Sequence, residues 1–173
     1  GNVIGGGDIA EDRIVPDAIK ALIANKQIQV RNPFSERPWQ HVLDPLNGYM
    51  KLAELMYKNQ INSNSNELCT CFNFGPKTNS NKNVTALVEE ILKYWDGSWV
   101  DKSNPQAPHE SKLLHLDIEK AQSKLGWRPV WGFSTTIEKT VLWYKKVHNK
   151  LLTPEEACLS DIENFLSLLD NEL

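Results

Sequence analysis

Helical stretches alternate along this chain with strand-like runs that are only a few residues long. Helices are predicted for residues 16–26, 45–58, 83–95, 118–125, 134–147 and 153–169. The strand-like runs are residues 2–4, 28–30, 68–74, 98–100 and 112–116. A complete doubly wound domain needs a succession of strong β-branched strands in βαβ units, and that series is absent from this sequence. The chain is therefore predicted to adopt a helix-rich α/β fold with a few short strands.

Capping residues mark where several of these helices begin and end. Asp44 is expected to cap a helix whose first residue is Pro45, because proline suits the first helical position. Asp117 is expected to cap the helix of residues 118–125, which ends before Gly126. Residues 153–156 (TPEE) have the pattern of a capping box. The last amphipathic helix is therefore expected to begin there.

Composition narrows the class of protein. A chain of 173 residues with 40% hydrophobic content can form one ordinary domain. Its formal net charge of -3 and its lack of dense Lys/Arg runs argue against nucleic acid as a partner. No apolar stretch approaches the roughly 20 residues of a membrane span, and no signal peptide is visible. These features predict a cytoplasmic protein.

The three cysteines form no recognisable disulfide framework, which suits a reducing compartment. Cys69 and Cys71 stand two apart in a strand-like run, so their thiols would share one face and could bind a metal. No second ligand pair follows at zinc spacing. The prediction is that Cys69 and Cys71 are plain buried cysteines and that the chain holds no metal.

The glycine-rich start fits the letter of a dinucleotide-binding fingerprint, with Gly5, Gly7 and Ala10 in the pattern G-x-G-x-x-A. That fingerprint needs a helix starting at its third small residue and an acidic residue about 20 positions later. The predicted helix starts only at residue 16, well after Ala10. Arg31 and Asn32 occupy the region in which the fingerprint requires an acidic residue. No tyrosine is followed four residues later by lysine, so the proton-transfer pair of short-chain dehydrogenases is also absent. The sequence predicts neither a cofactor site nor catalytic residues.

Four segments carry a resemblance to a known family: GNVIGGGDIAEDRIVPD, VRNPFSERPWQHVLDPLNGY, FNFGP and LDIEKAQSKLGWRP. They resemble the C-terminal part of the nucleotide-sugar enzymes in the extended short-chain dehydrogenase/reductase family, from Gly1 to about Lys150. RNP followed by RPWQHVL-x-PL-x-GY is typical of the branch that acts on CDP-glucose, whereas LGW-x-P is shared across the superfamily.

The resemblance implies that residues 1–150 form a nucleotide-sugar-binding lobe without the N-terminal Rossmann half, and that residues 151–173 form a helical tail. In the family, the missing half binds NAD and holds the catalytic groups, so this chain alone would be inactive. The implied substrate is CDP-glucose, which is dehydrated for polysaccharide building. Two alternatives stay open: another nucleotide-sugar dehydratase or epimerase, and a non-catalytic binding module. Apolar surface left without that half predicts self-association or a contact with a separate Rossmann half.

The resemblance also implies a set of substrate-binding residues. These are Asn2, Arg13, Arg31, Asn32, Arg37, Asn73 and His109. Arg37 is the strongest candidate, because it occupies the position whose guanidinium clamps the nucleotide diphosphate, and a planar fork matches two oxygens. Trp39 is expected in the core, and His41 is left open between a structural and a binding role. The tryptophans at 127, 131 and 143 are expected to pack in the core.

Overall fold

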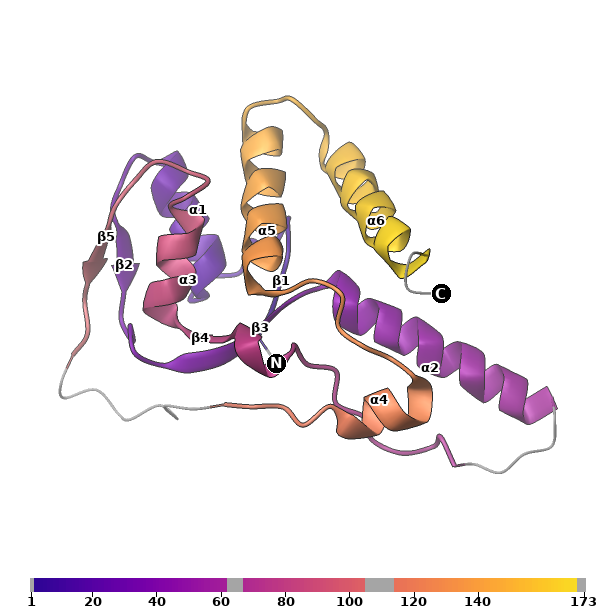
Figure 1. The fold of residues 1–173 in the computed structure, drawn as a ribbon. Coiled ribbons are helices and arrows are strands. Elements are labelled where there is room, and N and C mark those ends of the chain that lie inside the picture. The colour runs from indigo at the N-terminus through magenta and orange to yellow at the C-terminus, as the bar shows by residue number, and fades with distance from the viewer. Residues whose placement is uncertain (1, 62–66, 105–113, 171–173) are drawn as a thin grey trace.

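The structure, a computed structural model, describes residues 2–61, 67–104 and 114–170. Its strands are β1 (Asn2–Ile4), β2 (Ile28–Val30), β3 (Glu36–His41), β4 (Asn81–Asn83) and β5 (Trp99–Asp101). Its helices are α1 (Ile14–Ile23), α2 (Leu43–Ile61), the 3-10 turn η1 (Thr78–Ser80), α3 (Val84–Ile91), α4 (Glu119–Leu125), α5 (Phe133–His148) and α6 (Pro154–Asp170). The prediction of a helix-rich α/β fold is confirmed (Figure 1).

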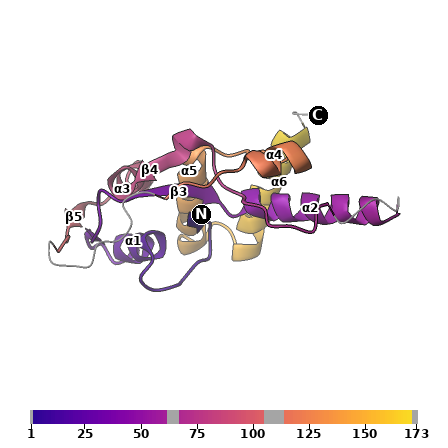
Figure 2. The ribbon, with the colours of Figure 1, turned by 90° about the horizontal axis from the view of Figure 1, so that it is seen from below.

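The strands form two small sheets. In the first, β3 lies between β1, to which it is parallel, and β4, to which it is antiparallel. In the second, β2 and β5 are parallel, although 71 positions of the chain separate Ile28 from its register partner Trp99. Figure 2 shows an elongated molecule, with β5 at one end and α2 extending to the other.

Two clusters of apolar side chains hold these elements together. The larger one joins α1, β2, β3, α3 and α5, and its fully buried members include Val30, Leu87 and Val141. The smaller one joins α2, residues 68–74 and α4 around Trp127. The tail helix α6 packs on α5, and its residues Ala157 and Phe165 are buried. The Phe165 ring lies edge-on to Trp131, just before α5. The predicted core positions of the tryptophans at 39, 127, 131 and 143 are confirmed.

The predicted helix ends at Thr153 and Gly126 are confirmed, whereas the caps predicted at Asp44 and Asp117 are wrong. The residue that caps α4 is Ile118, and Asp117 precedes it and accepts from the Glu119 N–H at 2.9 Å. The Thr153 hydroxyl accepts from the Glu156 N–H at 3.2 Å, and the Glu156 carboxylate accepts from the Thr153 N–H at 2.8 Å. Gly126 ends α4 with a φ of 61°, which glycine adopts without strain. Asp44 does not cap α2, which already begins at Leu43. Its carboxylate instead accepts from the Val130 N–H at 2.7 Å, because the side chain is fully buried against that loop.

Two predicted strands do not form in the described part of the chain. Residues 68–74 pair with no neighbouring strand, and residues 114–116 are also irregular. A strand is stable only when its backbone groups are paired with another strand. The prediction that Cys69 and Cys71 are buried is wrong, because both are exposed on this unpaired segment. Cys158, on α6, is also exposed. Among the described helices, none is long and apolar enough to cross a membrane.

Candidate functional site

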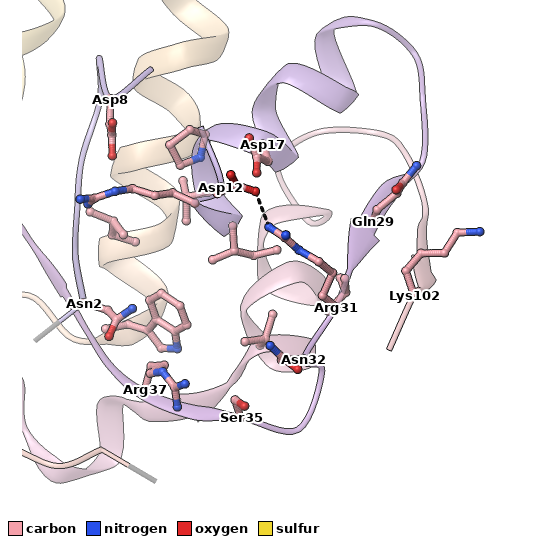
Figure 3. Close-up of a pocket in the computed structure, with 18 of the residues that line it drawn as sticks. Asn2, Asp8, Asp12, Asp17, Gln29, Arg31, Asn32, Ser35, Arg37 and Lys102 are labelled. Atoms are coloured by element: carbon pink, nitrogen blue, oxygen red, sulfur yellow. Dashed lines mark hydrogen bonds and ion pairs between the residues drawn. The ribbon is translucent and has the colours of Figure 1, made fainter. Parts of the chain in front are cut away.

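A cavity of about 1010 Å³ opens where β1, the loop before α1 and the ends of β2 and β5 meet (Figure 3). Five of the seven residues predicted to bind substrate line it: Asn2, Arg13, Arg31, Asn32 and Arg37. Asn2 and Arg37 lie on β1 and β3, Arg31 and Asn32 follow the end of β2, and Arg13 directly precedes α1. A cavity of this size suits a ligand as large as a nucleotide sugar. The structure therefore brings most of the predicted site together.

Parallel pairing of β2 and β5 places two cations at one edge of the cavity. Val30 ends β2 and is the register partner of Asp101, which ends β5. Arg31 and Lys102 follow these residues directly, and the Lys102 N–H donates to the Val30 carbonyl at 2.8 Å. Because the carboxyl ends of parallel strands meet at the same edge, both residues line the cavity. The Arg31 guanidinium points toward Asp12, whereas the Lys102 ammonium points away from it (Figure 3). Lys102 was not predicted, since its place depends on a pairing between distant segments.

The opposite wall is built on β3. Arg37 and Trp39 stand two apart on this strand, so their side chains share a face. Trp39 is 2% exposed, and its indole N–H donates to the Lys82 carbonyl at 2.9 Å. This hydrogen bond holds the Trp39 ring in place beside Arg37. The Arg37 guanidinium donates to the Glu36 carbonyl at 2.8 Å. Asn2 on β1 lies opposite Trp39 in the register of the two strands.

The charges in the cavity are mixed. Asp8, Asp12 and Asp17 line it beside the cations, and Arg31 donates to the Asp12 carboxylate at 2.8 Å (Figure 3). Both side chains of this pair are largely exposed, at 66% and 82%. Exposed ion pairs contribute little to stability. An anionic ligand can therefore take the place of Asp12 on Arg31 at small cost.

The glycine-rich loop after β1 serves packing. A Cβ on Gly6 would overlap the indole ring of Trp143, and Gly7 has a φ of 84°. The helix that follows begins only at Ile14, so its N-terminus is not presented to a phosphate held by this loop. These residues do not fit the pyrophosphate of a dinucleotide, in agreement with the sequence analysis.

Two predicted site residues lie elsewhere. Asn73 is not among the cavity residues, and its side-chain amide donates to the Asp117 carbonyl at 3.1 Å. His109 lies outside the described residues. The binding roles of both stay predictions.

His41 is a buried structural residue and does not line the cavity. It is 3% exposed and packs edge-on against Trp131, with 4.6 Å between the ring centroids. Burial and the nearby Lys139 ammonium lower the pKa of His41 to about 4, so the ring is neutral near pH 7. Burial raises the pKa of the neighbouring Asp44 to about 6. Within the described residues, no three His, Cys, Asp or Glu side chains are grouped to hold a metal.

Comparison with known proteins bears out the resemblance found in the sequence. No protein-family model matches the chain. Among solved structures it is similar to UDP-glucuronic acid 4-epimerase from Bacillus cereus, with a TM-score of 0.67 and 18% identity over 84% of this chain and 43% of that one. It is also similar to dTDP-glucose 4,6-dehydratase from Bacillus anthracis, with a TM-score of 0.64 and 17% identity over 84% of this chain and 42% of that one.

The fold is thus that of the C-terminal part of an extended short-chain dehydrogenase/reductase enzyme. Within that class, the chain is 43% identical over 148 residues to CDP-glucose 4,6-dehydratase from Salmonella typhimurium. The match covers 84% of this chain and 39% of the length of that relative.

Proposed function

We propose that this chain supplies the nucleotide-sugar-binding surface of a CDP-glucose 4,6-dehydratase, which converts CDP-glucose to CDP-4-dehydro-6-deoxyglucose and water for polysaccharide building. The observation that carries the proposal is the single cavity that Arg13, Arg31 and Arg37 all line. Guanidinium groups bind diphosphate oxygens through paired, charge-assisted hydrogen bonds. The identity to the Salmonella enzyme supports CDP-glucose as the particular substrate.

Binding here would serve the reaction by orientation. The diphosphate is held by arginines from β2, β3 and the start of α1, while Asn2 and Asn32 offer amides to the sugar or phosphate oxygens. Binding energy at the nucleotide then fixes the distant sugar ring, which lowers the entropic part of the barrier. In this proposal the chain contributes no catalytic group.

An exposed aromatic side chain lies in the loop that carries two cavity residues. Phe34 is 78% exposed between Asn32 and Ser35, and the loop is fixed because the Thr85 N–H donates to the Pro33 carbonyl at 3.0 Å. Aromatic rings on fixed loops are suited to stacking on a nucleobase. We assign Phe34 to the cytosine ring in this proposal.

The residues described here do not fit NAD, so the cofactor would be bound outside residues 1–173. The epimerase from Bacillus cereus was solved with UDP-glucuronic acid and NAD, and this chain covers 43% of it. We propose that a separate Rossmann half, or a second copy of this chain, covers the apolar surface that remains, and that the chain alone is inactive. The odd number of cysteines supports a cytoplasmic location. Sedimentation as a monodisperse monomer at tens of micromolar would contradict the association.

Calorimetric titration with CDP-glucose tests the binding role directly, with dTDP-glucose and NAD as comparison ligands. Arg37→Ala should weaken CDP-glucose binding by about tenfold or more, because a charge-assisted contact is lost. The matched control is Arg128→Ala, since Arg128 is exposed and lies outside the cavity. Equal loss in both variants would refute a diphosphate clamp at Arg37. Tighter binding of dTDP-glucose would favour another nucleotide-sugar enzyme, and binding without dehydration when a Rossmann half is added would favour a binding module.

A further inference from the structure

A second hollow, of about 320 Å³, lies at the start of α5. One side is formed by Asn79, Ser80 and Lys82, from η1 and β4, and the other by residues 132–135. None of these residues lines the large cavity, so the two hollows are separate sites. The proposed function makes no use of this second hollow.

The first turn of α5 presents unsatisfied N–H groups to the hollow. The helix has 16 residues, and its N-cap, Gly132, has no side chain to cap it. Within the described part of the chain, no hydrogen bond leaves the N–H groups of Phe133, Ser134 or Thr135. The first turn also contains no acidic residue. Such an end carries partial positive charge and favours an anion.

A buried hydroxyl gives an independent sign of a ligand. Ser80 is 1% exposed, and its Oγ has no hydrogen-bond partner among the described residues. Leaving a buried hydroxyl without a partner destabilises a protein. Because Ser80 lines the hollow, rotation about its Cα–Cβ bond lets the hydroxyl donate to an oxygen bound there.

The remaining wall adds one cation and no carboxylate. Lys82 lies on β4, and its exposed side chain borders the hollow. The hydroxyls of Ser134 and Thr135 add further donors at the helix end. No Asp or Glu is among the lining residues, in contrast to the three aspartates of the large cavity. A group with several acceptor oxygens and negative charge matches this set of donors.

We propose that the hollow at the start of α5 binds a phosphate group, either free phosphate or the phosphate of a small monoester. The backbone N–H groups of residues 133–135 and the Ser80 hydroxyl donate to its oxygens, and Lys82 balances its charge. The site is independent of nucleotide-sugar binding, because the two hollows share no residue.

The test is a titration of the 15N-labelled chain with inorganic phosphate, at constant ionic strength set with sodium chloride, followed by amide chemical shifts. Saturable shifts are expected at residues 132–136. Lys82→Gln should weaken the binding by about tenfold, as the loss of a charged partner does. Lys124→Gln is the control, because that lysine is exposed on α4 and does not line the hollow. It should leave the dissociation constant unchanged.

Two further variants separate binding from folding. Gly132→Asp should abolish the shifts at residues 133–136, since the new carboxylate caps the helix, and no atom lies within 4 Å of the position its Cβ would take. Ser80→Ala should weaken binding without lowering the melting temperature, because an unpartnered hydroxyl is removed. Phosphate shifts confined to the large cavity, or shifts at residues 132–136 that survive Gly132→Asp, would overturn the proposal. Titration with methyl phosphate in parallel distinguishes a monoester from free phosphate as the tighter ligand.

Discussion

In a variant with Asp44 replaced by asparagine, the free energy of unfolding should fall as the pH drops below about 6.5. In the wild-type chain, the free energy of unfolding should change little over the same pH range. The Asp44 side chain is fully buried, and one carboxylate oxygen accepts from the Val130 N–H at 2.7 Å. Its other oxygen, Oδ2, has no partner among the described residues. Burial raises the pKa of this carboxyl from the ordinary 3.8 to about 6.

The sign of the Asp44 contribution follows from that difference. The folded state binds the proton more tightly than the unfolded state, so acidification from pH 6 to pH 3.8 stabilises the fold. The contribution is fully present below pH 3.8 and is lost as the pH rises through 6. At 1.36 kcal/mol for each pKa unit, it amounts to about 3 kcal/mol.

His41 works in the opposite direction over nearly the same interval. Burial and the Lys139 charge lower its pKa from 6.5 to about 4, so the folded state resists the proton. Stability from the neutral ring is fully present above pH 6.5 and is lost as the pH falls through 4. This loss is also about 3 kcal/mol. The two buried groups therefore offset one another in the wild-type chain.

Urea unfolding followed by tryptophan fluorescence at a series of pH values between 4 and 8 measures these terms. Asp44→Asn keeps an acceptor for the Val130 N–H but removes the titration, so the His41 term should appear alone as a loss of about 3 kcal/mol on acidification. His41→Gln should show the reverse slope. Curves for Asp44→Asn and the wild type that run parallel across this range would refute the reasoning, whatever their vertical offset.

Three other predictions concern packing, capping and thiol access. Gly6→Ala should destabilise the fold by about 1–3 kcal/mol in urea unfolding, because the new methyl overlaps the ring of Trp143. Thr153→Ala should cost about 1 kcal/mol by removing the cap of α6, whereas Thr153→Ser should retain most of the stability. In the folded chain, a thiol reagent should modify three cysteines at rates close to those of the denatured chain, since all are exposed: Cys69, Cys71 and Cys158.

Local signals predicted the parts of the fold that local interactions determine. The capping box at Thr153 and the left-handed Gly126 each depend on a few adjacent residues, and both were predicted. Arg31 was predicted at a strand end because the short run before it and the following Pro33 are visible in the sequence. The family resemblance added Arg13 and Arg37, which no periodicity in the chain distinguishes from surface arginines.

Long-range contacts decided what local signals missed. Lys102 reaches the cavity because β5 pairs with β2, and no pattern near residue 102 indicates that pairing. Asp44 has the residue type and position of a helix cap, but it bonds to Val130, 86 positions away. Tertiary packing also leaves Tyr49 exposed on α2.

The unpaired segment 68–74 lies next to the exposed apolar side of α2, and the two together form one apolar surface. Tyr49 on α2 contacts Phe74 edge-on, with 5.3 Å between the ring centroids, and nearby Leu46 and Met50 are exposed. Strand-forming residues without a ladder, next to an apolar helix face, are features that a further sheet would cover. The chain spans 39% of the length of its relative from Salmonella. This surface lies on α2, away from the residues of the cavity, and its coverage would therefore leave the ligand site open.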